Sequence, residues 1–117
     1  MAARAFLQER FERNESVVFL ARDENANVVG FAQLYAQFSA LSLNRNWLLA
    51  DLFVAAEARL HGAGTALLRA SEDFARSEGA AAIALETAVG NRVAHRFCEA
   101  NGWLREHDWY QYSRPLG

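Results

Sequence analysis

The sequence contains no lysine, so all twelve of its basic residues are arginine. A Walker-type nucleotide loop requires a Gly-Lys-Ser/Thr motif, which this chain therefore does not contain. The formal net charge is -2, which is not the basic balance of a nucleic-acid-binding protein. These two absences argue against a P-loop and against nucleic acid as a partner.

Cysteine is also scarce, because Cys98 is the single one in the sequence. An internal disulfide is therefore excluded, and the composition fits a reducing compartment. Cys98 and the three histidines, His61, His95 and His107, show no zinc-type spacing, so we expect no metal.

Long apolar runs are absent as well, and no stretch is long enough to span a bilayer. Charged residues break up residues 1–14, so we expect no secretory signal there. The predicted location is the cytoplasm, with no membrane partner.

The composition indicates one folded domain over residues 1–117. A hydrophobic fraction of 52% is enough to build a core and argues against disorder. The pattern along the chain predicts the elements of that domain.

The first third of the chain predicts a helix and a β-hairpin. Ala2 to Arg13 has the spacing of a short amphipathic helix. Ser16–Arg22 and Val28–Gln37 are rich in β-branched and aromatic residues, and the polar turn Asp23–Asn27 joins them. Alternation in the second strand puts Phe31, Gln33 and Tyr35 on one face, and Gly30 marks a bulge or a close approach.

The middle of the chain predicts a βαβ unit. Trp47–Val54 is apolar at nearly every position and is expected to be covered on both faces. Helical spacing runs from residue 62 to 78 and ends at Gly79, which suits the left-handed position after a helix. Ala80–Thr87 then predicts a strand parallel to the first.

The last third predicts a second helix and further strand material. Asn91 is suited to cap the helix, and Asn101-Gly102 to end it. Trp103–Arg105 and Trp109–Ser113 are expected to form strands.

Gly62-Ala63-Gly64 lies between the apolar strand and the helix. Glycines allow a close approach of the backbone to an anion, and a helix N-terminus presents free N–H groups. Such a pair of glycines also occurs as a packing device. A Rossmann fingerprint needs a third glycine, where the chain has Leu67, and a preceding hairpin does not fit its doubly wound sheet.

The spacing of several motifs resembles that of the GNAT superfamily of acyl-CoA-dependent N-acetyltransferases. The matching segments span nearly the whole chain, and they are the Val-Gly-Phe of the hairpin, Asp51-Leu52-Phe53-Val54, Arg59-x-x-Gly62-x-Gly64, Asn91-x-x-Ala94-x-x-Phe97, Gly102-Trp103 and Tyr112. The resemblance implies an α/β (α+β) fold with a GNAT-like mixed central sheet. That sheet would contain the N-terminal antiparallel hairpin and the βαβ unit, followed by a C-terminal helix plus strands.

The resemblance also implies acetyl-CoA as acyl donor, bound without a metal. The glycine loop would hold the pyrophosphate, and the bulged strand before it would pair with the pantetheine arm. A backbone N–H near Phe53 or Val54 would polarise the thioester carbonyl. The implied cofactor-binding residues are Leu52, Phe53, Val54, Arg59, Leu60, His61, Gly62, Ala63, Gly64, Thr65 and Asn91.

Two departures from the family pattern concern proton transfer. The family often has a tyrosine as general acid where this chain has Cys98, which is either that acid or a small buried side chain. Ala50 stands where some members have a glutamate base, which leaves Asp51, Glu86 or water to accept the amine proton. Asp51 is the preferred candidate, because burial in an apolar strand would disfavour its charged form. The alternative is a carboxylate that fixes the bulge.

A third departure is at the N-terminus, because the chain begins at what resembles the family's second helix. The resemblance therefore implies that the first strand and first helix are absent and that the hairpin has an open edge. An open sheet edge favours association, so we expect a homodimer that covers it.

Together these features predict an enzyme that transfers an acetyl group to a primary amine of a small molecule or peptide by direct attack. The alternatives are a catalytically impaired CoA-binding domain with this fold and a plain α/β interaction domain.

Overall fold

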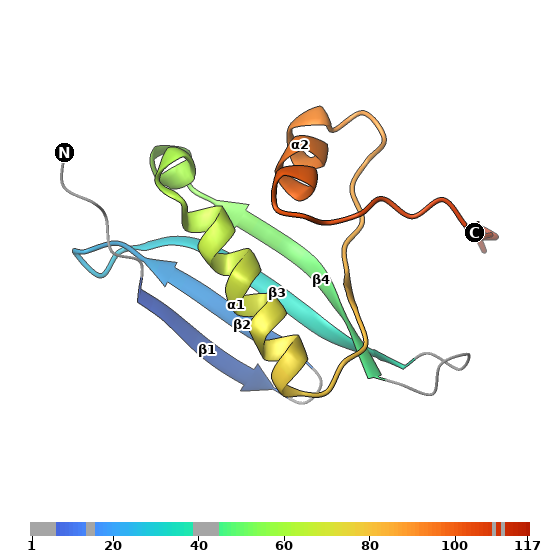
Figure 1. The fold of residues 1–117 in the computed structure, drawn as a ribbon, viewed down its shortest axis with the longest axis horizontal. Helices are drawn as coiled ribbons and strands as arrows, with labels where there is room; N and C mark the ends of the chain where they lie inside the picture. Colours follow the sequence, from blue (N-terminus) through green and yellow to red (C-terminus); the bar gives the residue numbers. More distant parts are fainter. Residues whose placement is uncertain (1–6, 14–15, 39–44, 109, 111) are drawn as a thin grey trace. The chain divides into compact units, whose positions relative to one another are not determined.

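The computed structural model describes residues 7–13, 16–38, 45–108, 110 and 112–117. It divides into two compact units, residues 1–86 and 87–117, which are described separately below. The first unit contains a five-stranded mixed sheet in the order β1-β2-β3-β4-β5, with α1 on one of its faces (Figure 1). The mixed α/β architecture predicted from the sequence is confirmed.

The predicted hairpin forms from β2 (Ser16–Arg22) and β3 (Val28–Phe38), which pair antiparallel. Asp23 organises its turn, because its carboxylate accepts hydrogen bonds from the Asn25 and Asn27 N–H groups at 2.9 and 3.0 Å. This is the local bonding for which aspartate is favoured in turns.

The helix predicted for Ala2–Arg13 is wrong from Leu7 onward, and its earlier part lies outside the described residues. Leu7–Arg13 is a strand, β1, that pairs antiparallel with β2 along its whole length. Pairing with β1 satisfies backbone hydrogen-bonding groups of β2 that would otherwise be unpaired. The free energy gained from these strand hydrogen bonds outweighs the local preference of this short segment for a helix. The edge that we expected to be open is therefore paired, and that reason for a homodimer no longer holds.

The βαβ unit is confirmed. β4 (Arg45–Val54) leads through a short 3-10 helix, η1 (Ala56–His61), into α1 (Ala63–Ser77), and β5 (Ile83–Ala84) pairs parallel with β4. β5 is much shorter than the predicted Ala80–Thr87. Its pairing stops at Leu48, just before a bulge where β4 changes register.

The bulge lies at Ala50. Gln33 pairs with Asp51 and Leu34 with Leu49, so Ala50 is the extra residue on β4. The extra residue shifts the alternation of side chains between the two faces by one position. Trp47 and Leu49 before the bulge and Leu52 after it therefore lie on the same face, toward α1. Asp51 and Phe53 consequently lie on the opposite face.

The core lies between α1 and one face of the sheet. Phe74 packs edge-on against Phe19 and Trp47, with ring centroids 5.9 and 4.8 Å away, and the Arg10 guanidinium lies 4.7 Å from its ring centroid. The other buried apolar side chains include Val17, Ala21, Ala32, Leu34, Leu49, Leu67 and Leu68. Trp47 is thus a core residue, as predicted.

Gly30 lies beneath α1 at a point of very close approach. A Cβ atom built on it would lie 2.7 Å from the Phe53 carbonyl oxygen and 3.1 Å from Leu67 Cδ1. The position therefore requires glycine, and the close approach predicted there is confirmed.

The expectation that β4 is covered on both faces is wrong. Trp47 and Leu49 are buried, but Asp51 and Phe53 are exposed on the other face. The reason is that the described helix of this unit covers one face of the sheet only.

The second unit is built around α2 (Arg92–Ala100), whose bounds match the predicted helix. Gly102 follows it with φ 85°, a conformation that glycine tolerates best. The strands predicted at Trp103–Arg105 and Trp109–Ser113 are not formed by the described residues of these segments, while residues 109 and 111 lie outside that description. Among the described residues of this unit the regular element is α2, and the unit offers these segments no described strand as a partner.

Candidate functional site

The C-terminal half of β4 has one free edge. On the β5 side, the described pairing ends at Leu48↔Ala84, while β3 continues to pair with β4 as far as Gly30↔Val54. Backbone groups of β4 beyond the bulge therefore have no strand partner on one side within the described residues. An unpaired edge of this kind accepts an extended ligand as an added strand.

Alternation along β4 identifies which groups point toward that edge. The Ala55 N–H donates to the Val29 carbonyl at 2.7 Å, which makes Gly30↔Val54 a pair without direct hydrogen bonds. The backbone groups of Leu52 and Val54 therefore point away from β3, and those of Phe53 point toward it. Of the two N–H groups considered for polarising a carbonyl, this favours Val54 over Phe53.

The free edge leads directly to the N-terminus of α1. Gly62 stands at the N-cap with φ 86° and ψ 7° and is exposed. Leaving aside its chain neighbours, no described atom lies within 4 Å of where a Cβ would be. The first turn contains no acidic residue, and no side chain caps it. The Ala66 N–H is bonded to the Gly62 carbonyl, so the N–H groups of Ala63, Gly64 and Thr65 precede this helical bond. Three such groups and the helix dipole favour an anion here.

Arg59 connects the strand to the loop. Its Nε donates to the Val54 carbonyl oxygen at 2.9 Å, and the side chain is exposed. This bond occupies the outward-pointing Val54 carbonyl. The two terminal nitrogens of the Arg59 guanidinium remain available to bind an anion. Leu60 and His61 are described by their backbone alone, as part of η1.

The structure places several of the predicted cofactor-binding residues along a continuous stretch of backbone. Leu52, Val54, Arg59 and residues 60–65 follow one another from the free edge to the helix N-terminus. Asp51 is exposed at the bulge, so the burial that supported it as a base is absent. Glu86, the other candidate, is exposed in coil at the end of this unit.

Two further candidates belong to the second unit. Asn91 caps α2, because its side-chain oxygen accepts the Ala94 N–H at 3.1 Å, as predicted. Cys98 is a free, half-buried thiol on α2. Burial raises the pKa of Cys98 above its ordinary value, the nearby Glu99 carboxylate raises it further, and a backbone hydrogen bond lowers it in part.

This direction predicts slow alkylation of Cys98 in the folded protein. A raised pKa means a smaller thiolate fraction at any given pH, and the thiolate is the reactive form. The rate of Cys98 alkylation by iodoacetamide is measured as a function of pH. We expect this rate to begin rising at a higher pH in native protein than in protein unfolded in urea. Glu99→Gln should move the native curve toward lower pH. Coincident native and unfolded curves would contradict this picture.

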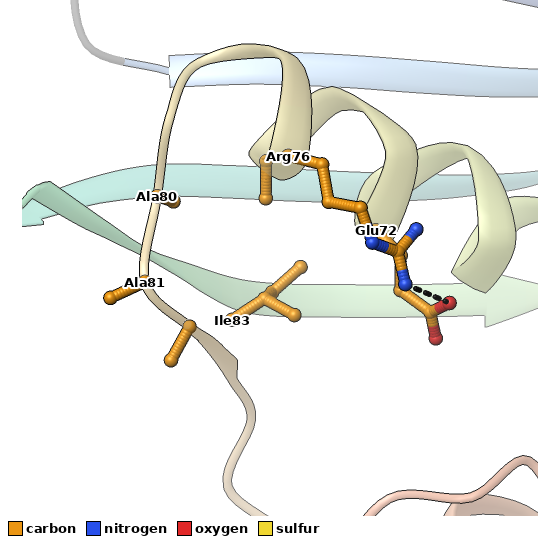
Figure 2. Close-up of a pocket in the computed structure, with 7 residues that line it drawn as sticks. Glu72, Arg76, Ala80, Ala81 and Ile83 are labelled. Carbon is orange, nitrogen blue, oxygen red and sulfur yellow. Dashed lines mark ion pairs between the residues drawn. The ribbon is translucent and has the colours of Figure 1, made fainter.

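A separate hollow lies toward the other end of α1. It has a volume of about 160 Å³ and lies between the C-terminal half of the helix and the segment leading into β5 (Figure 2). Its one carboxylate, that of Glu72, is paired with Arg69 at 2.9 Å and with Arg76 at 4.0 Å. Because Arg69 and Arg76 already pair with this carboxylate, it is not available as a free anion for a ligand.

The described residues contain no group of three or more His, Cys, Asp or Glu side chains placed to hold a metal ion. None of the helices in the described part of the chain is long and apolar enough to cross a membrane.

The free strand edge followed by a glycine-capped helix is the arrangement implied by the sequence resemblance. The family model described as the acetyltransferase (GNAT) family matches residues 2–103. The chain belongs to the acetyltransferase (GNAT) family.

The relatives of this GNAT chain are acetyltransferases by their descriptions. An uncharacterized N-acetyltransferase of Bacillus subtilis (strain 168), YhfO, is 43% identical over 110 residues, which cover 94% of this chain and 73% of that protein. A crystal structure of a probable acetyltransferase has 39% identity and a TM-score of 0.81, and the match covers 90% of this chain and 70% of that one. The chain is therefore an enzyme of the N-acetyltransferase type.

A more distant structure shows the fold alone. An aminoglycoside N-acetyltransferase in complex with CoA is 18% identical, with a TM-score of 0.77 and coverage of 90% of this GNAT chain and 70% of that chain.

Two residues that share the bulge face with Asp51 were not predicted as site residues from the sequence. Phe31 and Gln33 lie on β3 opposite Phe53 and Asp51. The alternation of residues 28–37 already put Phe31 and Gln33 on one face. Only the register with β4 brings that face to Asp51.

Proposed function

We propose that the chain transfers an acetyl group from acetyl-CoA to a primary amine, in a reducing compartment such as the cytoplasm. The observation that carries this proposal is the continuity between the free edge of β4 and the open N-terminus of α1. The extended pantetheine arm of acetyl-CoA can pair with a free strand edge. The pyrophosphate of acetyl-CoA needs N–H donors and few negatively charged side chains around it. The path from Leu52 to Thr65 supplies both in sequence. The CoA-bound aminoglycoside N-acetyltransferase of the same fold supports the choice of donor.

In this proposal, the pyrophosphate lies at the N–H groups of residues 63–65, with the charge of Arg59 nearby. The pantetheine arm runs along Leu52 and Val54. The Val54 N–H faces the thioester oxygen and stabilises the negative charge that develops on it. Asn91 contacts the arm, a role that rests on the family resemblance.

The amine nitrogen attacks the thioester carbon directly, so a C–N bond forms and the C–S bond breaks. The amine loses a proton to the Asp51 carboxylate, directly or through water, and the departing thiolate takes one. The Cys98 thiol is proposed as that donor. This role rests on the family resemblance, and burial raises the pKa of Cys98, which makes the thiol a weaker acid.

Turnover is tested with purified protein, acetyl-CoA and a panel of primary amines, by following the release of free thiol. We expect amine-dependent release above the background of acetyl-CoA alone, with the acetylated amine identified by mass spectrometry. Calorimetric titration with CoA runs alongside. CoA binding without turnover on any amine would favour a binding domain, and folded protein that does neither would contradict the proposal.

A further inference from the structure

The open face of the sheet carries an aromatic and acidic cluster at the bulge. We use the name bulge-face cluster for Phe31, Gln33, Asp51 and Phe53. They form two cross-strand pairs, Gln33↔Asp51 and Phe31↔Phe53, on the face opposite α1. The two phenyl rings are stacked, with centroids 5.9 Å apart and an interplanar angle of 30°.

This stack is accessible to a ligand. Phe53 is 51% exposed, although a large aromatic side chain next to another is normally a candidate for burial. The Asp51 carboxylate beside it is exposed, and within the described part of the chain no hydrogen bond or ion pair holds it. An exposed carboxylate with no partner among the described residues therefore lies next to an exposed aromatic surface.

Among the described side chains, no cation forms an ion pair with the Asp51 carboxylate of this cluster. Arg22 lies on the same face of the sheet on β2, but its guanidinium is already paired with Glu9. The cluster consequently presents a net negative site beside an apolar one. That combination complements an ammonium group attached to an apolar body.

The position of α1 decides how an acceptor reaches the strand edge. α1 covers the face of the sheet that contains Leu34 and Leu49, and these side chains are buried beneath it. An amine that approaches the edge of β4 at Leu52–Val54 therefore meets less obstruction from the opposite face. On the face opposite α1, the side chains adjacent in the chain to Leu52 and Val54 are those of Asp51 and Phe53.

We propose that the acceptor is a primary amine that carries an aromatic ring a short chain away from its nitrogen, with the ring on Phe31 and Phe53 and the ammonium at Asp51. The proposal rests on the function proposed above and names its substrate class. A hydrophilic polyamine would leave the stacked rings uncovered and would find only one carboxylate in the cluster.

The test compares 2-phenylethylamine with ethanolamine, two primary amines that differ in the group on the second carbon. We expect kcat/KM for 2-phenylethylamine to be about tenfold higher, the lower end of what an apolar group contributes in a pocket. Phe53→Ala should reduce this ratio to about twofold, mainly through KM, and Phe53→Leu should leave an intermediate ratio. Asp51→Asn should lower kcat/KM for both amines.

Phe11→Ala is the matched control. Phe11 is 52% exposed, lies on the same face on β1, and is separated from β4 by β2 and β3. The control should keep the ratio of the unaltered chain. Equal ratios in Phe53→Ala and Phe11→Ala, or a preference of the unaltered chain for ethanolamine, would overturn the proposal.

A binding measurement separates this proposal from the proposed function. Saturation-transfer NMR of 2-phenylethylamine with the CoA-saturated protein reports contact without turnover. Suppose that no amine is acetylated, but the ring protons of 2-phenylethylamine receive saturation and Phe53→Ala removes it. The proposed function then fails and the amine site stands. If Phe53→Ala and Phe11→Ala give the same signal as the unaltered protein, the amine site is wrong.

Discussion

Gly62→Glu is expected to weaken CoA binding by about a hundredfold at low salt, because it introduces a carboxylate where the pyrophosphate is proposed to lie. Gly62 is the N-cap residue of α1 and precedes the three N–H groups of residues 63–65. A Cβ atom added to Gly62 would meet none of the described atoms within 4 Å, so we expect the new carboxylate to be accommodated and to repel the anion. Isothermal calorimetry with CoA measures the effect, and added salt should reduce it.

The chain contains a matched control for this substitution at the other end of the same helix. Gly79 has φ 72°, close to the 86° of Gly62, and a Cβ atom placed on it would likewise meet nothing within 4 Å. Gly79→Glu therefore introduces a similar backbone strain and the same charge, but at the C-terminal end of α1. We expect it to lower stability without weakening CoA binding. Equal CoA affinities in the two variants would show that the loop assignment is wrong.

Gly62→Ala separates the two causes of the expected loss. It introduces the left-handed strain of about 1–2 kcal/mol without a charge. Its CoA affinity should lie much closer to that of the unaltered protein than to that of Gly62→Glu. An alanine variant as impaired as the glutamate variant would assign the effect to loop geometry.

Phe74→Ala is expected to lower the free energy of unfolding by about 3–5 kcal/mol. The side chain is 5% exposed and lies between Phe19 of β2 and Trp47 of β4, so its removal leaves a cavity under α1. Arg10 also loses its ring contact. For a domain whose total stability is about 5–15 kcal/mol, this is a large fraction. Urea unfolding followed by circular dichroism measures the change.

Phe11→Ala again supplies the comparison, since it removes the same atoms from a half-exposed site on the other face of the sheet. Its expected cost is about 0.5 kcal/mol or less, as is usual for surface positions. If the two variants lost similar stability, α1 would not pack on the sheet as described.

Much of the fold could be predicted because its signals are local. The hairpin follows from two runs of β-branched and aromatic residues around Asp23–Asn27. α1 follows from helical spacing between two glycines, Gly62 and Gly79, that both adopt positive φ. The glycine loop could be predicted for the same reason, because its groups are consecutive in the chain.

The errors have a common physical cause, which is that pairing depends on distant residues. Leu7–Arg13 has a short helical pattern, yet its partner β2 makes it a strand. Ala80–Thr87 has strand character, but only Ile83 and Ala84 pair, since the described β4–β5 pairing ends before the bulge.

The same dependence applies to the candidate site. Asp51 was expected to be buried because its neighbours in sequence are apolar. Its exposure follows from the bulge at Ala50 and from α1 covering a single face. No local pattern reveals either condition.

By itself, the sequence therefore determined the family motifs, the helices α1 and α2, and the order of strand, loop and helix that forms the path from Leu52 to Thr65. The tertiary structure decided where β4 parts from β5, which of its backbone groups face the free edge, and that Asp51 meets Phe31, Gln33 and Phe53 on an open face. The physical reason is that helical spacing and glycine conformation are properties of neighbouring residues, whereas register and exposure arise only when distant strands pair.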